Sequence, residues 1–365
     1  MKKIRCGVIG AGWWGTTAHL PALRDHPLSE IVAVQTADAG EAKRIADDFG
    51  APGAFTSHEE LLATPGLDAV VISSTANMHY EQVMAALGRG LHVLVEKPMT
   101  ITFEQARRIE ATARERNLHL LIGCPWHYTS HNIEARRLVH EGVLGPIKMI
   151  GVLMTNFSMG LYQGKPWREA FGNVTTRETP EMPYVAPGVN SYSDPAVAGG
   201  GHLYCQVSHV GAHLSFVTGA LPTEVYCRLD NGGTAVDVYD TLNVKMSDGA
   251  IVSVATTGAT MFTERHYEVR IYGVRGMILL DLWGGKMSFH DDAGNVKHYD
   301  PLPEDELYPM FAPTRNFVEL IAGTAANGSP GRLGVAAMGI IECAYRSARE
   351  GVNVSVPWDA TGGMA

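Results

Sequence analysis

Short apolar runs alternate with amphipathic stretches through the first third of the chain. Such runs, rich in Val, Ile and Leu, suit strands that are buried on both faces. These strands are expected at residues 4–9, 30–35, 67–73, 92–96 and 119–123. The helices expected between them lie at residues 15–23, 41–49, 58–63, 79–88 and 102–116. This repetition of strand and helix predicts an α/β domain with a doubly wound parallel sheet over residues 1–124.

The pattern changes near Cys124. One more helix is expected at residues 132–141, and strands dominate after it, at residues 147–156, 224–229, 238–246, 251–255, 267–272 and 277–281. Asn231-Gly232 and Asp248-Gly249 are typical of hairpin turns. Two helices follow at residues 313–325 and 335–349, and residues 160–197 form a predicted long loop of the kind that is often functional. Residues 125–365 are therefore predicted to form an α+β domain with a mostly antiparallel sheet.

Composition sets outer limits on the function. A chain of 365 residues exceeds the ~250–300 at which single cores stop growing, so two domains are expected. The formal net charge is −9 without a basic block, which argues against nucleic acid or an anionic membrane as a partner, and no apolar run reaches the ~18 residues of a membrane span. Because the first predicted strand begins almost at Met1, no signal peptide is expected. Five widely spaced cysteines without a C-x-x-C pair then favour a reduced, cytoplasmic protein.

A glycine-rich turn follows the first predicted strand. Gly10, Gly12 and Gly15 fit G-x-G-x-x-G, in which the first glycine allows a tight turn, the second lets the backbone approach a pyrophosphate, and the third lets the helix pack on the strand. The phosphates would lie at the helix N-terminus, whose N–H groups and dipole favour anions. The turn therefore predicts a dinucleotide site, and Trp13 and Trp14 within it are expected to contact the cofactor.

The residues after the second predicted strand bear on the choice between NAD and NADP. NAD enzymes usually carry Asp or Glu there, which binds the ribose 2′-hydroxyl. Thr36 occupies that place, so no carboxylate repels a 2′-phosphate, and Lys43 and Arg44 in the next helix could attract one. Asp38 could instead reach the ribose from two residues later. NAD is favoured, and NADP stays open.

A lysine ends a later apolar strand in the sequence VLVEKP. Lys97 thus lies at the carboxyl end of the strand, where doubly wound sheets bind their ligands, and Pro98 ends the strand because it has no N–H for the ladder. An ammonium group there could polarise a reacting oxygen or relay a proton. Glu96 could orient Lys97 or the nicotinamide ribose. The alternative is a surface lysine before a proline.

Several segments together resemble the glucose–fructose oxidoreductase / inositol dehydrogenase / MocA family: GVIGAGWWG, GLHVLVEKP, AGGGHLYCQVSH, NFVELI and ECAYRSARE. SSTANMHYE is similar to the family's T-P-N-x-x-H, with Ala76 in place of the proline and His79 one place early, which implies cofactor contacts for Ser74 and His79. The resemblance implies a Rossmann domain followed by an α/β domain whose large open sheet often forms the oligomer interface, so a homodimer or homotetramer is expected. It also implies oxidation or reduction of hydroxyl groups on sugars and cyclitols with NAD or NADP.

The segment AGGGHLYCQVSH matches part of the family pattern GGG-x-L-x-D-x-G-x-H, which implies that His209 is the general base. Cys205 stands where the family has an aspartate, and a neutral thiol cannot supply the negative charge that tunes a histidine. If residues 205–217 are helical, Cys205, His209 and His213 share one face with Gln206 beside it, which predicts a substrate-binding face. A buried polar helix is the alternative. A zinc site is not expected, because no carboxylate accompanies the two histidines, so we predict no metal.

The segment GCPWHYTSH follows the last strand of the first domain. The family places residues there beside the nicotinamide and the substrate. Trp126, His127 and Tyr128 are therefore candidates for stacking on a sugar face, for hydrogen bonding and for proton transfer. Plain packing between the domains is the alternative.

The predicted long loop also carries candidate substrate contacts. Lys165, Trp167 and Arg168 lie close together in it. They could hold a sugar with an anionic group, because an arginine suits bidentate recognition of an oxyanion. A solvated loop is the alternative.

Three functions are consistent with these features of the sequence. The leading hypothesis is an NAD(P)-dependent oxidoreductase that acts on a secondary hydroxyl of a sugar, glycoside or cyclitol, where a base takes the proton and nicotinamide takes the hydride. The second is an NAD-dependent glycoside hydrolase that works by transient ring oxidation, elimination, hydration and re-reduction, on a sugar that could carry an anionic group such as a sulfonate. Its extra acid/base groups would come from His127, Tyr128, His202, His209 and His213. The third, a non-catalytic NAD(P)-binding regulator, is disfavoured by Lys97 and His209.

Overall fold

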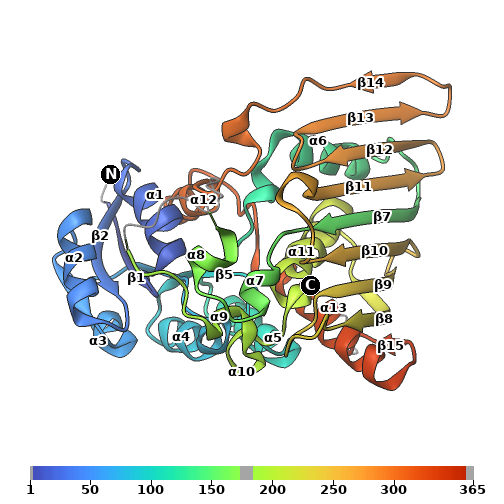
Figure 1. Cartoon of the computed structure of the whole chain (residues 1–365). Helices are drawn as coiled ribbons and strands as arrows, with labels where there is room; N and C mark the ends of the chain where they lie inside the picture. Colours follow the sequence, from blue (N-terminus) through green and yellow to red (C-terminus); the bar gives the residue numbers. More distant parts are fainter. Residues whose placement is uncertain (1–2, 173–183, 359–365) are drawn as a thin grey trace.

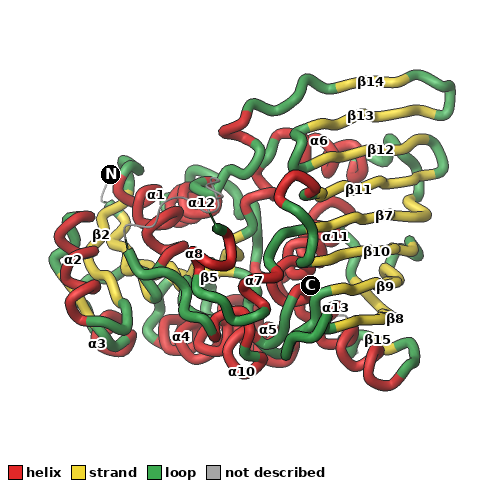
Figure 2. The backbone as a smooth tube through the Cα atoms, viewed as in Figure 1, coloured by secondary structure: helices red, strands yellow, loops and turns green. Residues whose placement is uncertain are grey.

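Two β-sheets organise the chain in the computed structural model, which describes residues 3–172 and 184–358 (Figure 1). The first sheet has six strands with helices on both faces, and the second has nine strands and lies beside it. The tube in Figure 2 shows the strands of the second sheet side by side, with short helices between the two sheets. The predicted α/β fold, a parallel sheet followed by a mostly antiparallel one, is confirmed.

All strands of the first sheet run parallel, in the order β3-β2-β1-β4-β5-β6. The order reverses between β1 and β4, which creates the switch point at which doubly wound sheets bind ligands. The three-residue strand β3 was not predicted, because it is too short to show a hydrophobic period. The bounds are β1 Ile4–Ile9, β2 Ser29–Gln35, β3 Gly53–Phe55, β4 Ala69–Ile72, β5 His92–Glu96 and β6 Leu120–Gly123.

Helices connect these strands. They are α1 Leu20–Arg24, α2 Ala39–Phe49, α3 His58–Leu62, α4 Ala76–Gly88 and α5 Phe103–Glu115. The helix expected at residues 15–23 is split, because a π-helical turn, η1 Gly15–His19, precedes α1. Side chains cap the N-termini of several of these helices: Asp38 caps α2 and Thr102 caps α5.

The second sheet has the order β14-β13-β12-β11-β7-β10-β9-β8-β15. Strands β7 and β10 pair in parallel, and the other pairs are antiparallel. Strands β13, β14 and β15 were not predicted, since they are short and mostly polar, as sheet edges often are. The bounds are β7 Ile147–Thr155, β8 Pro222–Asp230, β9 Tyr239–Met246, β10 Ile251–Thr257, β11 His266–Gly273, β12 Gly276–Asp281, β13 Lys286–Asp291, β14 Val296–His298 and β15 Val354–Ser355.

One face of the second sheet is covered by helices, and the other is open (Figure 1). Helices α11 Ser208–Thr218 and α13 Gly331–Glu350 pack on each other, and α13 packs on β8. Along β9, exposed and buried side chains alternate. Apolar side chains are exposed on β9 and β10, among them Tyr239 and Ile251. This agrees with the oligomer interface that the resemblance implies, and the oligomeric state stays a prediction.

The chain crosses between the two sheets several times. The predicted loop at residues 160–197 contains short helices in its described part: α7 Met159–Tyr162, α8 Trp167–Phe171, α9 Asn190–Ser193 and α10 Pro195–Ala198. Helix α12 Ala312–Ile321 returns to the first sheet, where Phe317 and Val318 are buried in its core. The other elements are η2 Pro125–Tyr128, α6 Ser130–His140, η3 Leu203–Val207, η4 Phe262–Glu264 and η5 Glu304–Glu306. Residues from distant segments therefore meet between the sheets.

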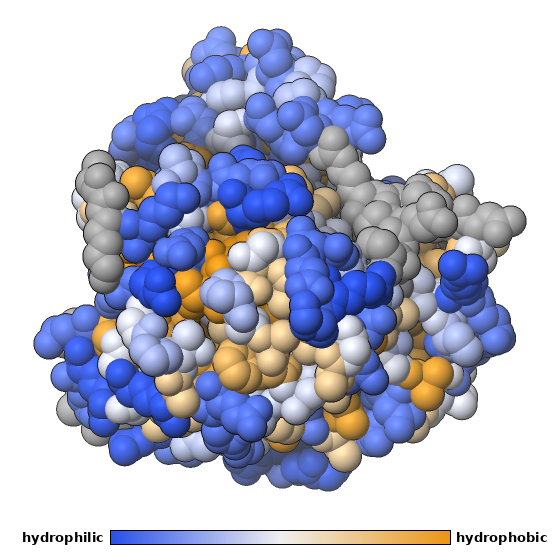
Figure 3. All heavy atoms as spheres, turned by 90° about the vertical axis from the view of Figure 1, so that its left-hand side faces the viewer, coloured by the Kyte–Doolittle hydropathy of each residue, from blue (hydrophilic) through white to orange (hydrophobic). Residues whose placement is uncertain are grey.

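The surface on the side of the first sheet is mostly hydrophilic, with apolar residues gathered in a recess near its middle (Figure 3). This distribution fits a chain with a formal net charge of −9. Among the helices of the described residues, none combines the length and the apolar character needed to cross a membrane.

Candidate active site

Two adjoining cavities lie at the carboxyl ends of the strands of the first sheet. The larger cavity, of about 520 Å³, is lined by the glycine-rich turn and by the ends of β2 and β4, and the inner cavity, of about 190 Å³, lies between β5, α11 and the second sheet. The residues that line both cavities are Trp13, Trp14, Ser73, Ser74, Lys97, Tyr192 and Cys205. A ligand in the larger cavity would therefore contact one in the inner cavity.

The glycine-rich turn leaves room for a ligand in the larger cavity. Gly10 has φ +75°, and a Cβ atom there would lie 2.4 Å from the backbone nitrogen of Ser74. A Cβ atom on Gly15 would lie 3.0 Å from the hydroxyl oxygen of Ser73, whereas one on Gly12 would meet only a carbonyl oxygen at 3.9 Å. Gly10 and Gly15 thus allow close packing of the turn, and Gly12 presents bare backbone to the cavity.

Among the described residues, no charged side chain lines the far end of the larger cavity. Thr36 lines it together with Gln35 and Ala37. Asp38 does not, because its carboxylate accepts the N–H of Glu41 at 2.8 Å and caps α2. The ammonium of Lys43 pairs with Asp47 and the guanidinium of Arg44 pairs with Glu41, on the same helix. Asp38 thus caps α2 and does not line the cavity, and no carboxylate lines this end of the cavity among the described residues.

Ser74 and His79 join the ends of two strands. The hydroxyl of Ser74 donates to Gln82 at 2.6 Å, and Ser74 lines both cavities. The ring nitrogens of the buried His79 lie 2.9 Å from the carbonyl oxygen of Pro98 and 3.1 Å from that of Ser74. Burial lowers the pKa of His79. His79 also lines the larger cavity, where it holds Ser74 and Pro98 together.

Glu96 is a buried anchor at the end of β5. Its carboxylate accepts the indole N–H of Trp14 at 2.9 Å and the backbone N–H of Lys97 at 3.1 Å, and it lies 3.2 Å from the ring nitrogen Nε2 of His19. Burial raises the pKa of Glu96, but the hydrogen bond with His19 and the charges of His19 and Lys97 outweigh it, so the pKa is lowered. Glu96 therefore fixes Trp14 and the backbone that carries Lys97.

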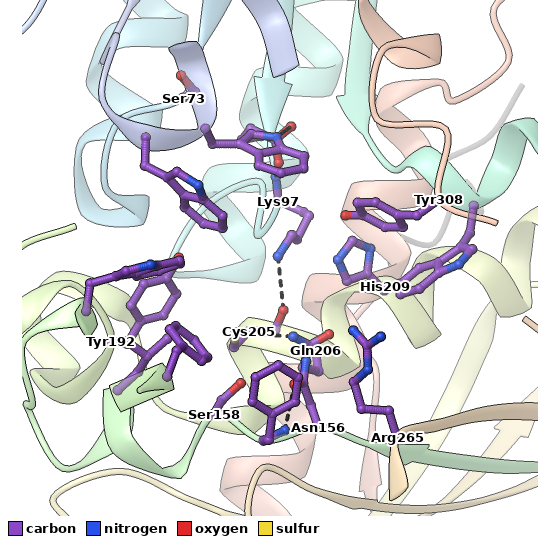
Figure 4. Close-up of a pocket in the computed structure, with 18 of the residues that line it drawn as sticks. Ser73, Lys97, Asn156, Ser158, Tyr192, Cys205, Gln206, His209, Arg265 and Tyr308 are labelled. Atoms are coloured by element: carbon purple, nitrogen blue, oxygen red, sulfur yellow. Dashed lines mark hydrogen bonds between the residues drawn. The ribbon is translucent and has the colours of Figure 1, made fainter. Parts of the chain in front are cut away.

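Lys97 reaches from the first sheet into the space between the cavities. Its ammonium donates to the carbonyl oxygen of Cys205 at 3.2 Å, and Figure 4 shows this contact across the cavity. The side chain lines both cavities. An ammonium at this junction can contact a reacting oxygen of a ligand in the inner cavity.

The predicted substrate helix is anchored at its start by a residue that the sequence did not single out. The buried carboxylate of Asp237 accepts the backbone N–H groups of Gly201 at 2.8 Å and Leu203 at 2.7 Å, and it also accepts the hydroxyl of Tyr345. A Cβ atom on Gly201 would lie 2.1 Å from the carbonyl oxygen of Asp237. The helix that follows starts with the π-turn η3 and continues as α11. Asp237 therefore sets the position of the residues along it.

Three of the four predicted residues of this helix line the inner cavity: Cys205, Gln206 and His209. The amide of Gln206 donates to the sulfur of Cys205 at 3.6 Å. His213 does not line it, because α11 runs away from the cavity, and its Nε2 atom lies 3.0 Å from the amide oxygen of Asn132. Burial lowers the pKa of His213 to about 4. His213 is thus a core residue, and the spacing of four residues alone did not reveal this.

His209 is a buried, neutral histidine at the inner cavity. Its ring meets that of Trp126 edge to face at 5.0 Å, and its Nδ1 atom has no hydrogen-bond partner among the described residues. Burial, then the charge of Lys97 and the nearby His127 and His213, hold the pKa of His209 well below its usual value. A neutral imidazole beside a cavity can accept a proton from a ligand hydroxyl.

Of the three candidates after β6, only Trp126 lines the inner cavity. His127 stacks on Phe216 at 4.5 Å, and its Nδ1 atom lies 2.9 Å from the hydroxyl oxygen of Ser329. The hydroxyl of Tyr128 donates to the side chain of Asn316 at 3.1 Å. The 3₁₀ turn η2 turns successive side chains in different directions, so His127 and Tyr128 point away from the inner cavity and do not line it.

Of the three candidate substrate contacts in the predicted loop, one lines the inner cavity. Trp167 lines the inner cavity, with its ring 4.4 Å from that of Trp13. Lys165 lies 3.8 Å from Glu169 in an exposed ion pair, and Arg168 is exposed. Neither lines a cavity, because both lie on the solvent side of α8 and the turn before it. These two candidate substrate contacts therefore lie outside both cavities.

Several lining residues were missed by sequence reasoning. Trp126 lies at the centre of an aromatic cluster that includes Trp283 and Tyr308, at ring distances of 5.0 and 4.8 Å. The end of β7 and the turn after it add polar groups. The missed residues are Ser73, Asn156, Phe157, Ser158, Leu161, Phe171, Tyr192, Arg265, Trp283 and Tyr308. No local motif marks them, since they come from short helices and turns that are distant in the sequence and meet only in the folded chain.

Comparison with known proteins agrees with this geometry. A family model described as "Oxidoreductase family, NAD-binding Rossmann fold" matches residues 4–124, and one described as "GFO/IDH/MocA C-terminal domain" matches residues 133–279. A solved levoglucosan dehydrogenase in complex with NADH has the same fold, with a TM-score of 0.79 and 18% identity over 98% of this chain and 100% of that one.

Two curated relatives are similar to parts of the chain. The dTDP-3,4-didehydro-2,6-dideoxy-alpha-D-glucose 3-reductase of Actinomadura kijaniata is 35% identical over 42% of this chain, and the match spans only 46% of that relative. The 1,5-anhydro-D-fructose reductase of Ensifer adhaerens is 28% identical over 75% of each chain. Because the family models match most of both domains, the chain belongs to the GFO/IDH/MocA family of oxidoreductases and has an NAD-binding Rossmann domain.

Proposed function

We propose that this protein is an NAD(P)-dependent oxidoreductase that acts on a secondary hydroxyl of a monosaccharide or cyclitol. The observation that carries the proposal is the inner cavity, where Lys97 and the neutral His209 line the same space beside the larger cavity. Named sugar reductases among the relatives support the substrate class. A non-catalytic regulator would have no need of these two groups.

The larger cavity fits a dinucleotide. The bare backbone at Gly12 and the turn at Gly10 suit a pyrophosphate, and Thr36 and Ser74, which line the same cavity, are the residues that we propose for the riboses. When bound, NAD or NADP supplies a hydride acceptor or donor. The uncharged end of the cavity favours neither cofactor by charge, so we propose NAD as the first to test and NADP as usable.

The residues of the inner cavity would divide the remaining work. His209 would take the proton of the substrate hydroxyl, and Lys97 would stabilise the negative charge that develops on that oxygen. Gln206, Asn156 and Ser158 offer hydrogen bonds to other hydroxyls. The aromatic side chains would pack on the C–H faces of a ring and exclude water.

The size of the inner cavity favours a single ring. Its volume of about 190 Å³ is below the ~300–1,000 Å³ of cavities that hold drug-sized ligands. The extra acid/base groups that a redox-assisted glycosidase would need, His127, Tyr128, His202 and His213, do not line it. Glu96 is its one lining carboxylate among the described residues, and it is engaged by Trp14 and His19. We therefore propose net hydride transfer rather than redox-neutral hydrolysis.

The test uses purified protein with NAD or NADP and a panel of free sugars, cyclitols and aryl glycosides. Absorbance of the reduced nicotinamide and release of the aglycone are followed together. We expect net cofactor reduction on a free sugar or cyclitol, and a fall in kcat of about 10²–10⁴-fold in Lys97→Met, because the oxygen loses its charged partner. Lys165→Met, an exposed lysine outside both cavities, is the matched control. Aglycone release without net reduction, lost when the cofactor is removed, would overturn the proposal.

A further inference from the structure

Two side chains hold the backbone of Gly10 in the glycine-rich turn. Gly10 follows β1 and has φ +75°. Its N–H donates to the side-chain oxygen Oε1 of Gln35 at 3.0 Å, and its carbonyl oxygen accepts the hydroxyl of Ser73 at 2.9 Å. Backbone groups that leave water need such partners, because an unpaired one costs free energy. Gln35 and Ser73 therefore stabilise the turn from the carboxyl ends of β2 and β4, the two strands beside β1.

Gln35 uses both ends of its side-chain amide. The nitrogen Nε2 donates to the carbonyl oxygen of Thr56, just after β3, at 2.9 Å, while Oε1 accepts the N–H of Gly10. The backbone carbonyl oxygen of Gln35 also accepts the N–H of Ala11 at 2.8 Å. A neutral amide can serve both side-chain partners, whereas an ionised carboxylate has no proton to donate to Thr56. A glutamate would therefore keep only the bond to Gly10, and a methionine would make neither bond.

Gln35 also lines the far end of the larger cavity, together with Thr36 and Ala37. This end lies at the carboxyl end of β2, where the acidic residue of NAD enzymes binds the ribose 2′-hydroxyl and where an arginine of NADP enzymes accommodates the 2′-phosphate. No charged side chain lines it among the described residues. The amide of Gln35 thus holds the turn and adds no charge to this end of the cavity.

We propose, on the basis of the function proposed above, that Gln35 positions the glycine-rich turn and determines that the larger cavity accepts NADP as well as NAD. Its oxygen holds Gly10 in the turn that would contact the pyrophosphate. A carboxylate at residue 35 would still accept the N–H of Gly10, but its negative charge would repel a 2′-phosphate. Gln35 is thus a positioning residue that acts through the backbone of Gly10, and it affects the choice of cofactor because it is neutral.

The test measures the binding of NAD and of NADP by calorimetry, without a sugar. The wild-type protein should bind the two cofactors within about tenfold of each other. In Gln35→Glu the affinity for NADP should fall about 10–100-fold more than that for NAD, because the carboxylate repels the 2′-phosphate. In Gln35→Met both affinities should fall about 3–10-fold with an unchanged ratio, because the hydrogen bond to Gly10 is lost. Gln163→Glu, at an exposed residue that lines neither cavity, is the matched control and should keep the wild-type affinities.

An unchanged ratio of NADP to NAD affinity in Gln35→Glu would overturn the role in cofactor choice, and so would a wild-type protein whose two affinities differ by more than about tenfold. Unchanged affinities for both cofactors in Gln35→Met would overturn the positioning role. If Gln35→Met does not fold, Gln35→Asn, whose shorter side chain does not reach Gly10, must lower both affinities and leave their ratio unchanged.

Cofactor reduction on the sugar panel is followed in a separate experiment. Cofactor binding as expected here, without reduction on any sugar, would refute the proposed function alone. Reduction of NAD on a sugar, with the same ratio of NADP to NAD affinity in the wild type and in Gln35→Glu, would refute this inference alone.

Discussion

The two ends of the site are built differently. At the larger cavity, the ligand would meet backbone and small residues at the strand ends of the first domain, between Gly10 and Pro98, together with residues of the segment 185–205. At the inner cavity, it would meet side chains from β5, α8, η3, α11 and the turn before β11, brought together from distant parts of the chain. A site made by backbone atoms tolerates substitutions that keep the backbone conformation. A site made by side chains is instead sensitive to the substitution of single residues. This difference predicts which substitutions affect each end.

The largest effect should come from the proton acceptor of the inner cavity. His209→Gln removes the imidazole that lines the cavity and should lower kcat about 10²–10⁴-fold with little change in the affinity for NAD, because the larger cavity is untouched. His213→Gln, one helical turn further on, should change kcat less than about tenfold and mainly lower stability, since it disturbs the core contacts with Asn132 and Tyr267 and lines neither cavity.

Steady-state kinetics and an NAD titration on both variants check this pair. Since burial holds the pKa of His209 well below its usual value, the imidazole stays neutral at mildly acidic pH, and kcat/KM should show no loss attributable to His209 between pH 8 and 6.5. Equal losses of kcat in the two variants would contradict the division between a cavity residue and a core residue.

The larger cavity should respond to a conformational change instead. Gly10→Ala places a Cβ atom 2.4 Å from the backbone at Ser74 in a residue with φ +75°, so NAD binding should weaken at least about tenfold and the free energy of unfolding should fall by about 2–4 kcal/mol. Gly50→Ala is the control, because Gly50 has φ +69° with nothing within 4 Å. It should cost only about 1 kcal/mol and leave NAD binding unchanged.

Calorimetric titration with NAD and thermal unfolding of both variants provide the measurements. Equal affinities of Gly10→Ala and Gly50→Ala for NAD would contradict this prediction, because close packing of the glycine-rich turn would then not be needed for NAD binding.

The smallest effect is expected at Asp240, which lies near Asp237, the residue that holds the start of the helix lining the inner cavity. Asp240 is buried near Asp237, and burial together with that charge raises its pKa to about 9, far above the usual value of 3.8. Because the folded state holds this proton more tightly than the unfolded state, the contribution of Asp240 to stability is complete below pH ~4 and is lost as the pH rises to ~9. Asp240→Asn should therefore gain about 2–4 kcal/mol relative to the wild type between pH 4 and 8.

Unfolding by urea at several pH values measures this gain, with the exposed Asp292→Asn as the control. A stability difference between Asp240→Asn and the wild type that does not change with pH would show that Asp240 releases its proton in the folded state.

Local sequence was informative where the backbone itself makes the site. The apolar runs located five strands of the first sheet, the glycine spacing located the turn at Gly10, and VLVEKP placed Lys97 at a strand end. The helical spacing brought Cys205 and His209 together correctly, but it extended the same face to His213. Periodicity reports which residues share a face, and it does not report where the neighbouring elements stop.

The sequence by itself therefore determined the parallel sheet, the dinucleotide turn and the lysine at the end of β5, because these follow from hydrogen bonding and periodicity within short segments. Only the tertiary structure decided that His127, Tyr128, Lys165 and Arg168 lie outside the cavities, and that Asn156, Ser158, Arg265, Trp283 and Tyr308 line the inner one. The direction of a side chain depends on the packing of elements that are distant in sequence, and no local pattern encodes that packing.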